Sequence, residues 1–283
     1  RDVEFLVDQA DVDETNQTAS IQNISRTFER TQSSPEVDAL FFSKVAQKAQ
    51  ELKGYHSATK RSDWTKDNVF SKLKAMLGAG KLRRYKAQGV LIMYVDSAIM
   101  DLLELSTEFT RKIEMTQIAE GGLGIQTRVT DIDGVPVMEV IDNERFYSKF
   151  NFDGENGGFE PVEAKYAKTE DTELASGKTY YTESGGVYTA VKSPVKGSLG
   201  DYYEKTDGSH AINVLIACGQ TCKIVPKISS IYYFAPGAHT EGDGYLYQNR
   251  SLSDVFVFPN GKDGKIDSIY VDVDTEDYVA PTE

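Results

Sequence analysis

The arrangement of hydrophobic and polar residues along the chain predicts helices in its first third and mainly strands afterwards. Over residues 1–8, apolar side chains largely alternate with polar ones, and a period of two is typical of a strand with one buried face. Over residues 15–32, apolar side chains recur at helical spacing within a polar stretch. This second pattern predicts a helix with a narrow apolar stripe.

The clearest predicted helix covers residues 34–52. Ser34 can cap it, Pro35 suits the first helical position, and Glu36 lies in the first turn, where the helix dipole favours acids. Gly54 is expected to end it. We predict about five turns packed on a sheet of carboxy-terminal strands. The predicted apolar face consists of Val37, Leu40, Phe41, Val45, Ala49 and Leu52, with Leu40, Phe41, Val45 and Leu52 pointing inward.

A compact α/β unit is predicted next. Residues 67–77 have the apolar spacing of a helix, and residues 90–95 form a continuous apolar run. Such a run is typical of a strand buried on both faces. Asp96 or Ser97 can then cap a short helix that continues to Leu105. The order helix, strand, helix indicates an α/β layer.

Strands dominate after Thr107. Residues 129–138 predict a hairpin around an Asp-Gly turn at Asp133 and Gly134. Further strands are predicted at residues 212–217, 230–234, 253–258 and 265–273, with turns at Asn260-Gly261 and Asp263-Gly264 before the last of them.

Residues 165–205 differ in composition from their surroundings. Large aliphatic residues become rare there, while tyrosine, threonine, glycine and lysine become frequent. Ser184-Gly185-Gly186, between Tyr181 and Tyr188, predicts a hairpin turn. We predict a small antiparallel β module inserted into the host domain; a disordered loop is the alternative, and the many tyrosines in a strand-like context argue against it.

Charge and composition exclude some classes of function. The chain has 283 residues and a net charge of -13, so it lacks the basic surface by which proteins neutralise nucleic-acid phosphates. A basic stretch at residues 81–86 is interpreted as a solvated helix end. The longest apolar stretch, residues 89–103, contains Asp96 and Asp101, so no segment is predicted to span a bilayer. Two cysteines cannot form a disulfide framework.

Several short motifs resemble catalytic or metal sites without completing them. Gly78-Ala79-Gly80-Lys81 lacks the first glycine and the final Ser or Thr of a phosphate-binding loop, so these glycines are expected to end a helix. Residues 260–266 resemble the middle of a calcium loop but lack its ligands at the first, third and twelfth positions. A tight turn explains them.

The remaining candidates for chemistry also favour structural roles. His56, His210 and His239 include no pair at metal-binding spacing. Cys218 and Cys222 are predicted to be buried free thiols, with His210 as the one candidate partner for a zinc site. The acidic group Asp11, Asp13 and Glu14 could bind a cation, but capping the following helix is the simpler role. We therefore predict no catalytic, cofactor-binding or metal residues, and no enzyme.

A resemblance to a known family is carried by two passages. Residues 11–15 read DVDET, and a helix opening PEVDA follows at residues 35–39. This pairing resembles tailed-bacteriophage major capsid proteins of the Hong Kong ninety-seven fold, in which an extended segment leads into a long spine helix. Residues 67–105 are similar to the family's axial α/β unit. Residues 250–257 and 264–273 are similar to the strands that return into its peripheral domain.

The resemblance implies an α+β capsid fold with a small all-β insertion. It places residues 1–58 and 226–283 in a peripheral domain with the spine helix, residues 59–225 in an axial domain, and residues 165–205 in the inserted β module. The implied function is a structural subunit that self-assembles through pentamers and hexamers into an icosahedral phage head and encloses DNA without specific binding. Scaffold, portal and decoration proteins are implied partners. The implied location is the virion capsid, assembled in the cytoplasm of the bacterial host.

Two other functions fit the same residues. An encapsulin-type nanocompartment shell shares the fold and encloses cargo enzymes in place of a genome. A carbohydrate-binding or adhesive surface protein is suggested by the tyrosine-rich residues 165–205.

Overall fold

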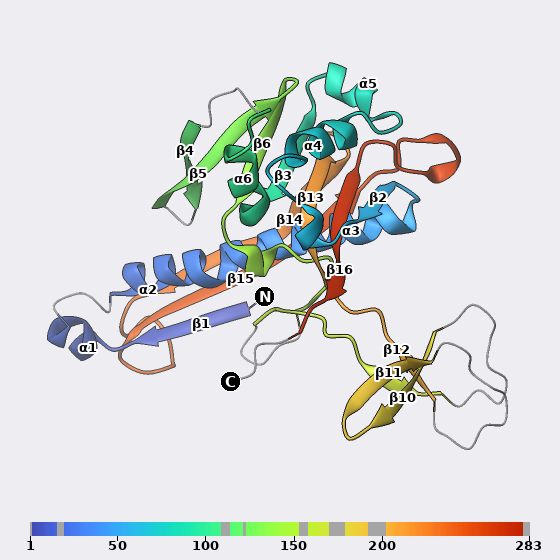
Figure 1. Ribbon diagram of the computed structural model, residues 1–283. Coiled ribbons are helices and arrows are strands. Elements are labelled where there is room, and N and C mark those ends of the chain that lie inside the picture. Colours follow the sequence, from blue (N-terminus) through green and yellow to red (C-terminus); the bar gives the residue numbers. More distant parts are fainter. Residues whose placement is uncertain are drawn as a thin grey trace.

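The computed structural model describes residues 2–15, 20–108, 114–120, 123–152, 158–169, 179–191 and 202–279. They form a mixed α and β structure with a large sheet and its helices above, a long helix across the middle, and a small sheet to one side (Figure 1). The fold class predicted from the sequence is confirmed at this level.

The largest sheet has seven strands. In spatial order these are β2 (Tyr55–Ala58), β16 (Tyr270–Asp277), β13 (His210–Cys218), β3 (Leu91–Asp96), β6 (Val135–Val140), β5 (Leu123–Ile132) and β4 (Glu114–Glu120). Helices α4 (Val69–Leu77), α5 (Leu82–Ala87) and α6 (Ser97–Glu104) accompany it. A buried cluster that includes Trp64, Leu73, Leu77, Met93, Met100, Leu103 and Val214 joins α4, α5 and α6 to the sheet.

The predicted α/β unit is confirmed. β3 supplies Leu91, Met93 and Val95 to the core, and the Asp96 side chain accepts a hydrogen bond of 2.9 Å from the Ala98 amide, so it caps α6. The predicted hairpin at residues 129–138 also forms, because Asp133 and Gly134 both adopt the positive φ that a tight Asp-Gly turn requires.

The long helix is longer than predicted. α2 (Ile21–Phe28) continues through a π-helical turn (Glu29–Ser33) into α3 (Ser34–Glu51). Ser34 is therefore inside the helix and caps nothing, which corrects the predicted start. Pro35 has no amide hydrogen to donate to the turn before it, so a backbone hydrogen bond is missing where the π turn meets α3.

The buried face of α3 also differs from the predicted one. Its buried residues are Pro35, Ala39, Phe42, Ser43, Val45, Ala46 and Ala49, whereas Leu40, Phe41 and Leu52 are only partly buried. Val45 and Ala49 are buried as predicted, and Ala39 and Ala46 are buried beside them. Phe42, not Phe41, is the central aromatic residue of a second core cluster that also contains Phe146, Leu215, Val255 and Ile269.

A three-stranded sheet lies beside the long helix. Its order is β1 (Asp2–Val7), β15 (Tyr245–Val257) and β14 (Cys222–Phe234). All pairs are antiparallel, and a bulge interrupts the β14–β15 register between Pro226 and Ile228. Both long strands extend well beyond the predicted residues 230–234 and 253–258. Below, β14 and β15 together are called the ribbon.

Two further expectations need correction. The last strand, β16, starts at Tyr270 instead of residue 265, because residues 260–267 form a turn in which Asp263 and Gly264 adopt positive φ. The acidic run at residues 11–15 does not cap a following helix. It lies in a separate short helix, α1 (Gln9–Glu14), with Thr15 at its end and the Asp8 carboxylate as its cap.

The described parts of residues 165–205 contain four short strands, in agreement with the predicted antiparallel β structure. β9 (Tyr166–Lys168), β10 (Tyr180–Ser184), β11 (Val187–Val191) and β12 (Tyr203–Lys205) form an antiparallel sheet in the order β11-β10-β12-β9. Gly185 and Gly186 adopt positive φ in the β10–β11 turn. This module, defined as residues 165–205, lies apart from the seven-stranded sheet (Figure 1). A two-stranded pair, β7 (Phe150–Asn151) and β8 (Glu160–Pro161), precedes it.

The seven-stranded sheet contains strands from each of the three ranges 1–58, 59–225 and 226–283. The peripheral and axial division is therefore not a division between sheets, and it stays a prediction about how neighbouring subunits meet.

Candidate assembly surface

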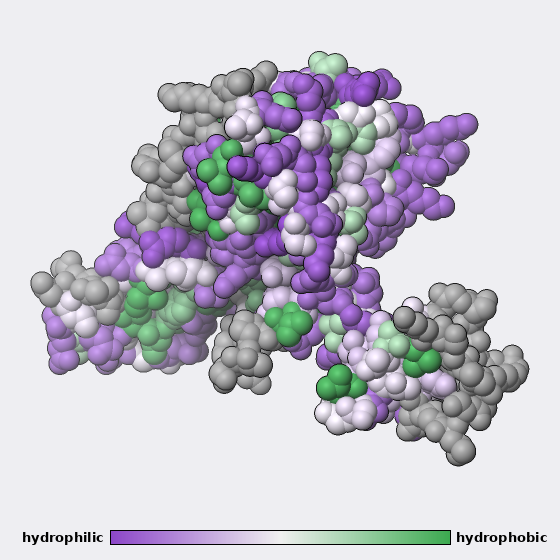
Figure 2. Space-filling view, in the orientation of Figure 1, coloured by the Kyte–Doolittle hydropathy of each residue, from purple (hydrophilic) through white to green (hydrophobic). Residues whose placement is uncertain are grey.

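The ribbon carries an unusual concentration of exposed apolar side chains. Hydrophobic residues that are 36% to 61% exposed occur along both strands and just beyond them, at Ile224, Val225, Ile228, Ile231, Tyr232, Tyr233, Leu252, Phe256 and Phe258. Figure 2 shows hydrophobic residues gathered near the end of the molecule where Figure 1 places β1 and the far end of the ribbon. Exposed apolar residues gathered along one pair of strands are typical of a surface that contacts another molecule.

The exposed residues lie on both faces of β14. In β15, Tyr247, Asn249 and Val255 are buried toward the helix, and directly opposed residues share a face. By register, the helix-side residues of β14 are Ile224, Ile231 and Tyr233, and the residues on the other side are Val225, Ile228 and Tyr232. The long helix packs on β15, so β14 extends past it with apolar side chains uncovered on both sides.

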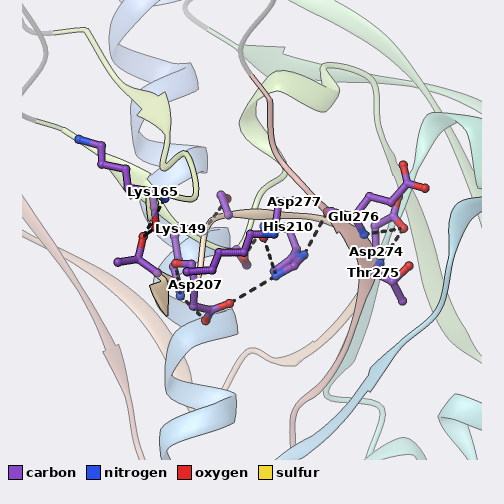
Figure 3. A network of polar contacts seen from close by, with 12 residues as sticks. Lys149, Lys165, Asp207, His210, Asp274, Thr275, Glu276 and Asp277 are labelled. Carbon is purple, nitrogen blue, oxygen red and sulfur yellow. Dashed lines mark hydrogen bonds and ion pairs between the residues drawn. The ribbon is translucent and has the colours of Figure 1, made fainter. Parts of the chain in front are cut away.

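A polar network fastens the module to the rest of the molecule (Figure 3). Lys149 Nζ lies 2.5 Å from the Asp207 carboxylate, and Lys205 of β12 pairs with Asp277 of β16. His210 Nε2 lies between these carboxylates, 3.5 Å from Asp207 and 3.7 Å from Asp277. His210 Nδ1 is 3.1 Å from the carbonyl of Glu276. Ion pairs therefore join residues 205–207, where the chain leaves the module, to β16 and to the segment before β7.

The two chain segments that enter and leave the module lie side by side. The Thr206 amide donates to the Lys165 carbonyl at 2.7 Å, and the Ser209 amide donates to the Val162 carbonyl at 2.7 Å. A Cβ added at Gly208 would stand 2.8 Å from the Ala164 amide nitrogen, so glycine permits this close approach. Ends this close are what an inserted unit needs.

We expect the attachment of the module to weaken in acid. The hydrogen bond and charge of Lys149, together with His210, hold the pKa of the Asp207 carboxyl below its ordinary value. A carboxylate with a lowered folded-state pKa stabilises the fold above its unfolded pKa and loses that contribution as pH falls through the folded value. The measurement is the unfolding free energy of wild type minus that of Asp207→Asn across pH 7 to 2.5. The difference, about 0.2–1 kcal/mol for a largely exposed pair, should vanish at the acid end.

The control is the substitution Glu183→Gln, which removes a carboxylate at the far turn of the same module. A wild-type advantage over Asp207→Asn that stays constant down to pH 2.5 would contradict this role for Asp207.

A second polar group is fully buried between β2, β13 and β16. Asp272 accepts hydrogen bonds from the hydroxyls of Ser57 and Thr59 and, at 2.9 Å, from the amide of Asn213. Nearby, the buried Asp96 pairs with Arg61, whose Nε lies 3.8 Å from Asp274. Both oxygens of Asp272 are occupied by donors from neighbouring strands, so this arrangement serves to join strands.

The glycines and the lysine that resemble a phosphate-binding loop have structural roles. Gly78 ends α4, as expected, while Gly80 adopts φ +45° directly against the Tyr55 ring. Lys81 Nζ pairs with Asp267 at 2.6 Å, and the Tyr55 hydroxyl accepts from the Lys81 amide. These residues hold the turn after α4 against β2.

The histidines and cysteines are not brought together. His56 Nδ1 lies 3.2 Å from the Gly54 carbonyl, and His239 Nε2 lies 2.7 Å from the Gly244 carbonyl. Cys218 and Cys222 are buried free thiols, as predicted, and burial raises the pKa of Cys222 to about 11. Within the described ranges, no three His, Cys, Asp or Glu side chains are grouped so as to hold a metal ion.

Among the described helices, none has the length and apolarity needed to cross a membrane.

Sequence comparisons give no relatives. No family model matches the chain, and no curated protein matches it.

Comparison of structures finds phage proteins at very low sequence identity. A structure described as Mycobacterium phage Che8 is similar with a TM-score of 0.46 and 8% identity, over 96% of this chain and 69% of that one. A chain from the asymmetric unit of the bacteriophage PhiM1 mature capsid has a TM-score of 0.41 and 11% identity, over 97% of this chain and 70% of that one. Similarity at this level assigns no fold family to this chain.

Proposed function

We propose that the chain is the major capsid protein of a tailed bacteriophage, with the Hong Kong ninety-seven fold and no enzymatic activity. The observation that carries this proposal is the ribbon, whose β14 exposes apolar side chains on both faces. A single subunit leaves this surface in water, where exposed apolar area is unfavourable. Contact with neighbouring subunits covers it.

The arrangement of elements supports the proposal. The DVDET run precedes the long helix, as it does in the family the sequence resembles. The α/β unit of β3, α4 and α6 corresponds to the expected axial region, and the ribbon with the long helix corresponds to the peripheral region. Under this proposal β16, from the last part of the chain, belongs with the axial sheet.

The proposed mechanism is tiling. Axial regions gather around five-fold and six-fold axes, and peripheral regions meet around three-fold contacts. Repeated contacts with closed symmetry give a stable shell even when each contact is modest. A subunit with a net charge of -13 encloses DNA without binding it tightly. Scaffold, portal and decoration proteins are the proposed partners, and assembly takes place in the cytoplasm of the host.

The module is proposed to project from the axial region, away from the contacts that build the shell. Replacing residues 165–205 with a short Gly-Ser linker should therefore leave assembly intact, because residues 162 and 209 are already hydrogen bonded to each other. The measurement is the yield of particles in a sedimentation gradient, with the intact chain as control. Loss of particles from a variant that still folds would make the module an assembly element.

The test of the proposal is the content of the assembled particle. The complete protein, produced with its scaffold, should sediment as closed shells or capsomer rings, and particles from phage-producing cells should contain nuclease-protected DNA. Particles that hold a cargo enzyme and no DNA would favour the nanocompartment alternative. A protein that stays monomeric at high concentration with its scaffold present would contradict both shell functions.

A further inference from the structure

We infer that residues 228–234 of β14 pair, backbone to backbone, with a strand of a second copy of this chain. The inference rests on the proposed function and specifies one of the contacts that would build the shell.

The position of β14 in its sheet is the first observation. In the order β1-β15-β14, β14 is an edge strand, and it hydrogen bonds to β15 along its full length. None of the other described strands pairs with its outer side. An edge strand presents a row of unpaired amides and carbonyls that can accept another strand.

The free edge of β14 has two parts: one contains residues that block strand pairing, and the other, called the open part, contains none. Proteins block unwanted edge pairing with proline, lysine and bulges. In β14 these features occur together at Pro226 and Lys227, where the register with β15 shifts. Residues 228–234 follow with the sequence ISSIYYF, which contains no charge, no proline and no glycine and has high β propensity.

The side chains of the open part require a partner that covers both faces. Ile228 and Tyr232 lie on one face and are 45% and 50% exposed, while Ile231 and Tyr233 lie on the other and are 61% and 51% exposed. A strand added at the usual spacing of about 4.8 Å places its own side chains beside both sets. Packing against one face alone would leave the other in water.

Charge favours a copy of the same chain as the partner. The strand β14 carries Lys223 and Lys227 and no acidic residue, whereas the chain as a whole has a net charge of -13. The two lysines lie before the pairing segment, where they complement the acidic remainder of a neighbouring copy, while residues 228–234 supply the pairing itself. A pairing of seven residues is too small to hold an isolated dimer, so it suits a shell in which each copy makes several contacts.

The first test is the substitution Ile231→Lys, with Val187→Lys as the matched control. Val187 is 64% exposed on a strand of the module, so the two changes are alike in chemistry and exposure. Wild type and Val187→Lys should assemble equally in the presence of scaffold, while Ile231→Lys should lose at least tenfold in particle yield and keep its circular dichroism and melting temperature. Hydrogen exchange of residues 228–234 should slow on assembly in wild type.

The outcomes separate this inference from the proposed function. If wild type assembles and Ile231→Lys assembles as well as Val187→Lys, with unchanged exchange at residues 228–234, the edge pairing is refuted and the capsid function stands. If wild type does not assemble, the capsid function fails, and the pairing is tested alone with a photo-crosslinker at position 232. The crosslinker is used in a mixture of ¹⁵N-labelled and unlabelled chains, at a protein concentration high enough to populate a weak contact. Links between labelled and unlabelled chains support it. Links only within one chain, or to another protein, refute it.

Discussion

Phe42→Ala is expected to lower the free energy of unfolding by about 3–5 kcal/mol, the usual cost of removing a buried aromatic ring. Phe42 is 6% exposed and packs edge-to-face with Phe146 at 4.8 Å and with Tyr94 at 5.3 Å between ring centroids. It joins α3 to the core that includes Val255 and Ile269, so its loss leaves a cavity at the contact between helix and sheet. Urea denaturation at constant pH measures the change.

Phe41→Ala is the matched control for this substitution. Phe41 is the adjacent residue of the same helix and is only partly buried, so its truncation should cost clearly less than that of Phe42. If the two variants were equally destabilised, or if Phe41→Ala were the worse, the orientation of α3 described here would be wrong.

Arg61→Ala is expected to be the second most damaging change. Asp96 is completely buried and its carboxylate pairs with Arg61, and removing one partner of a buried pair leaves an uncompensated charge. We expect a loss of about 3 kcal/mol at pH 7, the low end of the range for buried pairs, because the Arg61 side chain is 36% exposed. Lys60→Ala is the control, since the Lys60–Glu276 pair is exposed on both sides and should contribute less than about 1 kcal/mol.

The cost of Arg61→Ala should also depend on pH. Burial raises the pKa of Asp96, and the Arg61 charge opposes this rise, so the variant's carboxyl should have a still higher folded-state pKa. A raised folded-state pKa gives stability that is present below the unfolded value and is lost as pH rises through the folded value. The deficit of the variant relative to wild type should therefore shrink between pH 7 and pH 4. A deficit that grows in acid would show that Asp96 is not the group left unpaired.

Local sequence patterns identified a largely apolar strand, a helix cap and turns of fixed chemistry. The buried run of β3, the Asp96 cap of α6, and the Asp133-Gly134 and Gly185-Gly186 turns all occur where the sequence places them. In each case a few adjacent residues determine the geometry, through a cap, a positive φ or a run of buried and partly buried apolar side chains.

Other features depend on contacts that are distant in sequence. Val45 and Ala49 of the predicted face are fully buried, but Leu40 and Phe41 are only partly buried, and Ala39, Phe42 and Ala46 take their place in the core. The large size of Leu40 and Phe41 therefore led to a predicted face that is rotated from the buried one. Three small residues, Ala39, Ala46 and Ala49, belong to the buried face, and a search for large apolar residues at helical spacing gives them little weight. The sequence pattern also did not predict the full length of β14, because a strand exposed on both faces has no alternation of apolar and polar residues.

The assembly surface was missed for a related reason. Ile231 and Tyr232 belonged to a predicted strand of ordinary composition and Ile228 lay outside it, and the exposure of all three follows from the tertiary position of β14 at the edge of a sheet. The signal that could have identified them is the uncharged seven-residue run directly after Pro226-Lys227, which has the composition of a pairing strand without the usual guards.

The proposed capsid function requires that neighbouring subunits cover the ribbon in a closed shell. The most direct measurement is electron cryomicroscopy of particles formed by the complete protein, at a resolution that separates strands. We predict an icosahedral shell with the seven-stranded sheet around the five-fold and six-fold axes, the module projecting from it, and β14 buried between subunits. A map in which β14 faces solvent on both sides, or a preparation in which the folded protein forms no particles, would contradict this account.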